Sequence, residues 1–343
     1  MTSAAFTPGE VNPARKVWPQ RWAQVSKAAK PGQTLQLYLL LEPVLVSALF
    51  ENLPASNAEP LFGFARNTKE GKASPWLVHL GSSDKPLKKP QQEFLDQALD
   101  LVQTTPCATL LASTCGLPVV LAHLRQAMGV KMAGPDASYL AFWDPAVLAF
   151  LMGQSDVDSN SRIEPILNPQ QRQALLGPLT HWWCWTRSGR LYEYAPEQGA
   201  ARPAAGLPLT LSRSQTDALV QANVPDLLIY YINLNQPHLR DKLLPLPMHW
   251  FVRQQLVFAR RLGLAGTRDL LNYVCLALMA GARVNQVPVV KPILARVKAG
   301  SLSFDKAMNE LGEVLNDNEK NLEEPKVLVN EKGFPLTEMQ LPL

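Results

Sequence analysis

Up to about residue 153, short apolar runs alternate with longer segments whose apolar positions recur every three or four residues. The short runs are bounded by Pro, Gly or Ser and are typical of buried strands. They cover residues 34–42, 74–81, 107–113 and 138–143. The longer segments have the helical period and predict helices at residues 13–30, 43–53, 89–103, 117–128 and 145–153. This alternation predicts an N-terminal α/β lobe with a small sheet and flanking helices.

The pattern changes twice after residue 153. A polar stretch at 154–168 predicts a loop, and a short helix opened by Asn168 follows it. Residues 180–195 then read as a β-hairpin that turns at Ser188-Gly189. From residue 208 onward the period is helical. We therefore predict an α+β protein with an α/β lobe at residues 1–206, a helical-bundle lobe at 207–316, and an acidic, mixed or loosely docked tail at 317–343.

Charge adds a weak constraint on the partner. The net charge of +4 over 343 residues is too small to indicate a nucleic-acid-binding protein. The segment 240–298 is nevertheless rich in Arg and Lys, and the sequence after Asp317 is rich in Glu. This asymmetry predicts either an electrostatic docking face or a tail that folds back on its own lobe.

The N-terminal residues lack the apolar core of a signal peptide, and the longest apolar stretch is interrupted by Glu42 and Pro43. The four cysteines have neither the pairing nor the density of a disulfide scaffold. We expect a soluble cytoplasmic protein that does not enter a membrane.

Motifs for phosphate binding, dinucleotide binding, a serine nucleophile or zinc are absent from the sequence. We therefore expect no catalytic residue, no cofactor and no metal. Asp144-Pro145, between two apolar runs, has two interpretations. An Asp before a Pro is a natural helix N-cap, which we favour. The alternative is a hydrolase-like site that uses Asp144 and one of the five histidines.

Aromatic residues are concentrated in the predicted hairpin, which carries Trp182, Trp183, Trp185, Tyr192 and Tyr194. Exposure of some of these rings would favour a protein partner, whereas burial would make them part of a core. The pair Tyr230-Tyr231 is ambiguous in the same way.

Several short phrases, in this order and spacing, resemble one bacterial family. They are the stretch ending in Glu42-Pro43, the run Pro75-Trp76-Leu77-Val78, the run Trp143-Asp144-Pro145, and Gly177-Pro178 followed by Trp182. They are similar to successive segments of the type VI secretion adaptors, also called effector chaperones. Ala141 and Ala146 stand where that family carries arginines, and Glu42 stands where it usually has Asp.

The resemblance implies a non-enzymatic protein that binds a toxin effector in the cytoplasm and loads it onto the VgrG spike protein without being secreted. We predict that partner binding uses Trp183, Trp185, Tyr230, Arg260 and Arg261, between the two lobes. The alternatives are the enzyme near Asp144 and a nucleic-acid-binding protein that uses the basic lobe.

Overall fold

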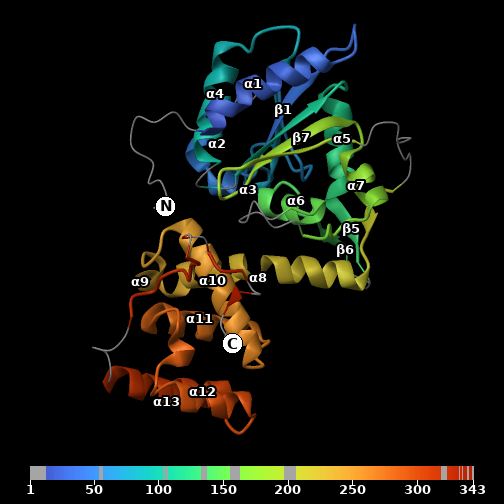
Figure 1. Cartoon of the computed structure of the whole chain (residues 1–343). Coiled ribbons are helices and arrows are strands. Elements are labelled where there is room, and N and C mark those ends of the chain that lie inside the picture. The colour runs from blue at the N-terminus through green and yellow to red at the C-terminus, as the bar shows by residue number, and fades with distance from the viewer. Residues whose placement is uncertain are drawn as a thin grey trace. The chain divides into compact units, whose positions relative to one another are not determined.

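The structure is a computed structural model, and it divides the chain into two units (Figure 1). The N-terminal unit extends to Gln221 and the helical unit begins at Ala222. The described residues are 13–53, 57–102, 105, 107–132, 137–154, 163–196, 206–317, 323–331, 333, 335–337, 340 and 341. Strands lie in the N-terminal unit and the helical unit is built from helices, so the predicted α+β class is confirmed.

The N-terminal unit alternates helices and strands, as its hydrophobic pattern predicts. Its elements are α1 (Pro13–Ala28), β1 (Gln36–Leu41), the 3₁₀ helix η1 (Pro43–Leu45), α2 (Ser47–Glu51), β2 (Ala58–Pro60), α3 (Lys69–Ala73), β3 (Trp76–Ser82), α4 (Lys89–Leu101), β4 (Ala108–Ser113), α5 (Leu117–Met128), β5 (Gly129–Lys131), β6 (Ala137–Tyr139), α6 (Pro145–Met152), α7 (Pro169–Leu176), β7 (Leu179–Trp185), β8 (Leu191–Tyr194) and β9 (Leu209–Thr210). The long helix α8 (Arg213–Asn235) follows.

Six strands form one antiparallel sheet in the order β2-β3-β1-β4-β7-β8. The predicted hairpin is confirmed as β7 and β8, and Gly189 takes a positive φ of 78° in its turn. The strand expected at 138–143 is shorter than predicted and does not join the six-stranded sheet. Only β6 forms, and it joins a separate sheet in the order β6-β5-β9. Phe142 instead packs on Trp182, with ring centroids 5.6 Å apart, so the chain bends into the core there.

Both faces of the six-stranded sheet are covered. Leu39, Leu110 and Trp183 point into a core shared with α1, α2 and α4. Leu40 and Trp182, on the opposite face, point into a core shared with α5, α6 and α7. Figure 1 shows α1 and α4 beside each other, and they are in contact. Each buried Trp removes about 150–250 Å² from water, which is worth roughly 4–6 kcal/mol relative to full exposure.

The division between the units falls inside α8, whereas the sequence predicted a boundary after residue 206. The start of α8 packs on the N-terminal unit: the side-chain amide of Gln215 donates to the carbonyl oxygen of Ile166 at 2.6 Å, and Leu219 contacts that unit's core. β9 also pairs with β5. These contacts continue the N-terminal unit past the predicted loop at 196–206, of which residues 197–205 lie outside the described residues.

The helical unit is built around one core. Its elements are the second half of α8, α9 (Pro237–Arg240), α10 (Pro245–Arg261), α11 (Thr267–Ala280), the 3₁₀ helix η3 (Val284–Gln286), α12 (Lys291–Lys298) and α13 (Phe304–Asp317). α10 packs on α11, and α12 packs on α13. Val252, Leu256 and Ala259 of α10 are buried in this core. Over the described residues, no helix has both the length and the apolar character needed to cross a membrane.

The described part of the C-terminal tail folds back on the helical unit. Leu328 and Leu341 lie in its core. The buried side chain of Gln254 holds this segment, because its Nε2 donates to the carbonyl oxygens of Leu328 (2.8 Å) and Leu336 (3.1 Å). Its Oε1 accepts from the backbone N–H of Leu328 at 2.9 Å. One glutamine therefore satisfies three backbone groups of a segment that has little regular structure.

Asp144 occupies the corner where the chain enters α6. Its side-chain oxygen accepts from the backbone N–H of Ala146 at 2.8 Å, and Pro145 is the first helical residue. Gly153 ends the helix with a φ of 81°. The N-cap interpretation of the acid-proline pair is therefore confirmed, and the carboxylate is used by its own helix.

We predict that Gln254→Met lowers the free energy of unfolding by about 1–3 kcal/mol, because buried backbone groups of the tail lose their partner. Chemical denaturation measures this loss, and limited proteolysis reports release of the tail. Gln97→Met, at an exposed position of α4, is the matched control and should change stability by less than about 0.5 kcal/mol. Equal effects of the two substitutions would contradict the role given to Gln254.

The cap at Asp144 predicts a specific pattern of rescue. Asp144→Ala should cost about 1 kcal/mol, whereas Asp144→Asn should cost only a few tenths, because asparagine also accepts from the first turn of a helix. Thermal or urea unfolding of both variants gives the comparison. An Asn variant as destabilised as the Ala variant would contradict the cap, because asparagine can accept the same hydrogen bond.

Candidate functional site

The predicted binding residues Trp183 and Trp185 are buried rather than exposed. Both lie on β7 under α1, with exposed fractions of 0% and 2%. The ring of Trp18 packs on both, with centroid separations of 5.0 Å and 6.3 Å. The interpretation in which these rings are exposed to a partner is therefore wrong. The reason is that α1 covers the sheet face that an isolated hairpin would leave open.

Trp183 also belongs to a polar cluster at the edge of the sheet, which we call the Glu193 cluster. The carboxylate of Glu193 accepts from the indole N–H of Trp183 at 2.9 Å and from the guanidinium of Arg21. The ring of His181 stacks on Trp183 and places its Nε2 3.7 Å from Glu193. Because Arg21 belongs to α1 and Glu193 to β8, the cluster fastens the helix to the sheet.

Burial and charge act in opposite directions within the Glu193 cluster. Burial raises the pKa of Glu193, but the hydrogen bonds from Arg21 and Trp183 and the charge of Arg21 outweigh it, so the pKa lies below its ordinary value. Burial lowers the pKa of His181, although the charge of Glu193 opposes this. The cluster therefore favours an ionised glutamate beside a neutral imidazole at neutral pH.

The other three predicted residues lie in the helical unit, so the structure does not assemble the five into one site within either unit. Tyr230 is 59% exposed on α8 and contacts Tyr231. Arg261 donates to the carbonyl oxygen of Leu341 at 3.4 Å and lies over the ring of Phe258. Arg260 is exposed. A binding role for these three residues stays a prediction.

Two further histidines make structural contacts in the N-terminal unit. The ring of His123 hydrogen-bonds the carbonyl oxygen of Leu175 at 2.8 Å, and that of His79 contacts the side chain of Gln36 at 2.9 Å. Burial lowers the pKa of both. Within the described ranges, no group of three or more His, Cys, Asp or Glu side chains is placed to hold a metal ion.

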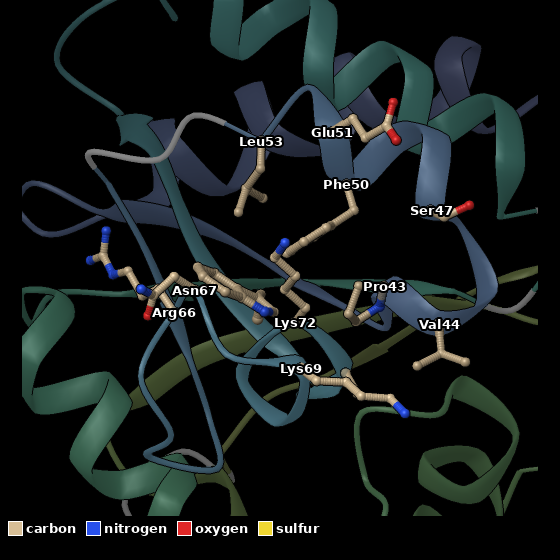
Figure 2. A pocket seen from close by; sticks show the side chains of 12 residues that line it. Pro43, Val44, Ser47, Phe50, Glu51, Leu53, Arg66, Asn67, Lys69 and Lys72 are labelled. Carbon is tan, nitrogen blue, oxygen red and sulfur yellow. The ribbon is translucent and has the colours of Figure 1, made fainter.

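A surface groove of about 700 Å³ lies elsewhere on the N-terminal unit, between the segment 43–53 and the segment 66–76 (Figure 2). Its apolar part is formed by Pro43, Val44, Phe50, Leu53, Ala73 and Trp76, and its polar part by Ser47, Glu51, Arg66, Asn67, Lys69 and Lys72. Val44 is 68% exposed, whereas Trp76 is 3% exposed. The groove therefore combines an open apolar edge with a buried aromatic floor.

The floor of the groove is fixed by local contacts around α3. The indole N–H of Trp76 donates to the carbonyl oxygen of Gly71 at 2.9 Å, and Phe50 packs edge-on against Trp76 with centroids 5.2 Å apart. Thr68 caps α3 by accepting from the backbone N–H of Gly71 at 3.0 Å. A Cβ at Gly71 would meet the carbonyl oxygen of Ala65 at 2.0 Å, so this turn needs a residue without a side chain.

The rim of the groove is basic on the α3 side. Lys69 and Lys72 are exposed, and over the described residues neither forms an ion pair. Arg66, in contrast, pairs with Glu59. Figure 2 shows Lys72 beside Phe50 in the middle of the view, whereas the carboxylate of Glu51 points away from them. Two cations are therefore available next to an apolar floor.

An aromatic patch combines the loop that carries Arg66 with the end of β6. We define it as Phe62, Phe64 and Tyr139 above the buried ring of Trp143. Phe62 contacts the other three, with centroid separations of 6.4 Å to Phe64, 5.4 Å to Tyr139 and 5.6 Å to Trp143. Phe64 is 49% exposed and Tyr139 is 71% exposed. Exposed aromatic side chains gathered in this way are typical of surfaces that bind proteins.

Glu42 connects the groove to the aromatic patch. Burial raises the pKa of Glu42, although hydrogen bonds from the backbone of Val44 and the indole of Trp143 oppose this. Pro43 and Val44 line the groove, and Trp143 underlies the patch. Neither the groove nor the patch was predicted from the sequence. The sequence signal that could have found the groove was a pair of phrases, one ending in Glu42-Pro43 and the other containing Trp76. The fold brings these two phrases together at the groove.

The Glu193 cluster predicts a pH dependence of stability. The pKa of Glu193 is lower in the folded protein than in the unfolded chain. The stability that Glu193 contributes is therefore fully present above about pH 4.3, and it is lost as the pH falls through the pKa of the folded state. Glu193→Gln should cost on the order of 1 kcal/mol at neutral pH, because Arg21 is partly exposed. Between about pH 6 and about pH 3 this variant should lose less stability than the wild type.

Denaturant unfolding as a function of pH measures this difference. Glu93→Gln removes the carboxylate of an exposed i,i+4 pair with Lys89 and serves as the control, with a pH profile close to that of the wild type. Parallel profiles for Glu193→Gln and the wild type would contradict the role of the cluster.

The part of the chain that carries the groove and the aromatic patch matches a family model. Residues 37–162 match the model of a family described as Domain of unknown function (DUF4123). No curated protein and no solved structure matches the chain. The matched segment covers less than half of the chain, and it contains the whole groove, the aromatic patch and Glu42.

Proposed function

We propose that this protein is a cytoplasmic adaptor that binds a toxin effector of a type VI secretion system and promotes its loading onto the VgrG spike, without being secreted itself. One observation carries the proposal: the groove and the aromatic patch lie wholly inside the segment that matches the family model. The same segment carries most of the phrases that resemble the adaptors. The candidate binding surface therefore lies in the same segment of the chain as the match to the family model.

The groove chemistry supports binding rather than catalysis. Its floor is apolar and its rim carries flexible lysines, an arrangement suited to a protein partner. Asp144 is used as a helix cap, and burial raises the pKa of the Cys107 thiol to about 12, which makes it a poor nucleophile. We infer that the protein acts without a catalytic step.

The basic helical unit gives less support to nucleic-acid binding. Several of its cations are already paired with carboxylates, as in Arg268 with Asp305 and Arg296 with Glu310. Such pairing reduces the charge available to a phosphate backbone. The adaptor hypothesis is therefore the one we retain.

We predict that the affinity-tagged protein, produced in a bacterium that carries it with a working type VI system, co-purifies with one toxin and with VgrG. Mass spectrometry identifies both proteins against a tag-only control. Deletion of the protein should remove that toxin from the culture supernatant while VgrG is still released. The proposal is wrong if neither protein is enriched, or if the adaptor itself is secreted with the spike.

A further inference from the structure

We infer that the groove binds a segment of the toxin in which acidic side chains flank a large apolar side chain. This inference rests on the proposed function and adds the chemistry of the contact. The apolar side chain lies on the floor formed by Phe50 and Trp76, and the carboxylates pair with Lys69 and Lys72.

The floor provides a preformed apolar seat. Trp76 is held by its hydrogen bond to Gly71 and by the ring of Phe50, so it does not need to rearrange on binding. A preformed surface loses little conformational entropy when a partner binds, and this raises affinity. Val44 and Pro43 extend the apolar surface to the open edge. The volume of about 700 Å³ leaves room for more than one side chain.

The rim provides charge complementarity to an acidic segment. Lys69 and Lys72 are three residues apart on α3 and therefore lie on the same side of that helix. Arg66 is occupied by Glu59, and Glu51 points away in Figure 2. Two neighbouring ammonium groups at an apolar surface favour carboxylates that arrive together with an apolar side chain.

The exposure of the groove favours a polypeptide over a small ligand. Ser47, Glu51, Lys69 and Lys72 are exposed, and Val44 is mostly exposed, so the site is open along one side. Small-molecule sites usually enclose most of their ligand. A free phosphate would use the lysines and leave the aromatic floor uncovered. A segment of protein uses both parts.

The test uses the full-length protein and the toxin identified by co-purification. Lys69→Glu combined with Lys72→Glu should weaken toxin binding at least tenfold, and the wild-type affinity should fall as salt is raised. The matched control is Lys16→Glu combined with Lys85→Glu, which makes the same change in charge at two exposed positions outside the groove. The control should bind within about twofold of the wild type.

A second variant protects the test against a folding defect. Val44→Glu changes a side chain that is 68% exposed, so it should preserve the fold while it repels an acidic segment. Circular dichroism and thermal unfolding establish that each variant is folded. Charge reversal of the acidic residues in the toxin segment should restore binding to the Lys69→Glu and Lys72→Glu variant.

Photo-crosslinking identifies the segment directly. A benzoylphenylalanine in place of Val44 should crosslink to a toxin peptide that contains acidic and large apolar residues, as read by mass spectrometry. The same group in place of Val119, which is exposed but does not line the groove, should not crosslink to that peptide.

The outcomes separate this inference from the proposed function. Toxin that binds the groove variants as tightly as the wild type overturns the inference and leaves the adaptor role standing. A crosslinked segment without acidic residues, or a crosslink to VgrG instead of the toxin, also overturns it. Absence of both toxin and VgrG in the purification overturns the adaptor role and this inference together.

Discussion

Burial of the six-stranded sheet on both faces is the constraint on which the N-terminal unit depends. Trp182 and Trp183 are neighbours on β7 and point in opposite directions, so each needs a separate layer of helices. α1 supplies one layer, and its attachment needs the Glu193 cluster because the indole N–H of Trp183 must keep a partner when it leaves water. The same burial explains why the tryptophans of the hairpin are not surface anchors. Apolar side chains stay accessible in the groove, where β1 ends and β3 begins.

Three stretches far apart in the sequence meet at one such end. Glu42 directly follows β1, Trp76 begins β3, and Trp143 lies two residues before α6. Pro43 and Pro75 adjoin Glu42 and Trp76, and Pro145 begins α6 two residues after Trp143, so a proline restricts the backbone near each of these element ends. Glu42 then accepts from Trp143, and Trp76 forms the floor beside Pro43. Two of the phrases that carry the family resemblance, those with Pro43 and Trp76, therefore also line the groove, and a third contributes Trp143 below the aromatic patch.

Local structure was largely predictable from the sequence. The N-cap at Asp144, the capping box that begins at Asn168 and the turn at Gly189 depend on residues close in the chain, and all three are present. The burial of Trp183 was not predictable in this way. Alternation along a strand shows that its side chains face two directions, but it does not show whether a distant helix covers the second face.

The candidate site was harder to predict for the same reason. The groove joins residues from η1, α2, α3 and the start of β3, and its shape depends on how these short elements pack. Sequence reasoning favoured Tyr230, Arg260 and Arg261 because aromatic and basic residues are common at interfaces. Composition says which residue types bind well, but exposure and pairing decide which of them are available. The pairing of Arg261 with the backbone of Leu341 is an example.

The pairing of Arg66 with Glu59 shows how the groove can discriminate between partners. Three unpaired cations around a groove would attract many polyanions, including nucleic acids. Glu59 neutralises one of them and at the same time ties the loop that carries Phe64 to β2. The two remaining lysines have long, flexible side chains, and they contribute orientation and a salt-dependent part of the affinity. The rest of the affinity depends on the rigid aromatic floor. This floor favours partners that bring an apolar side chain together with their charge.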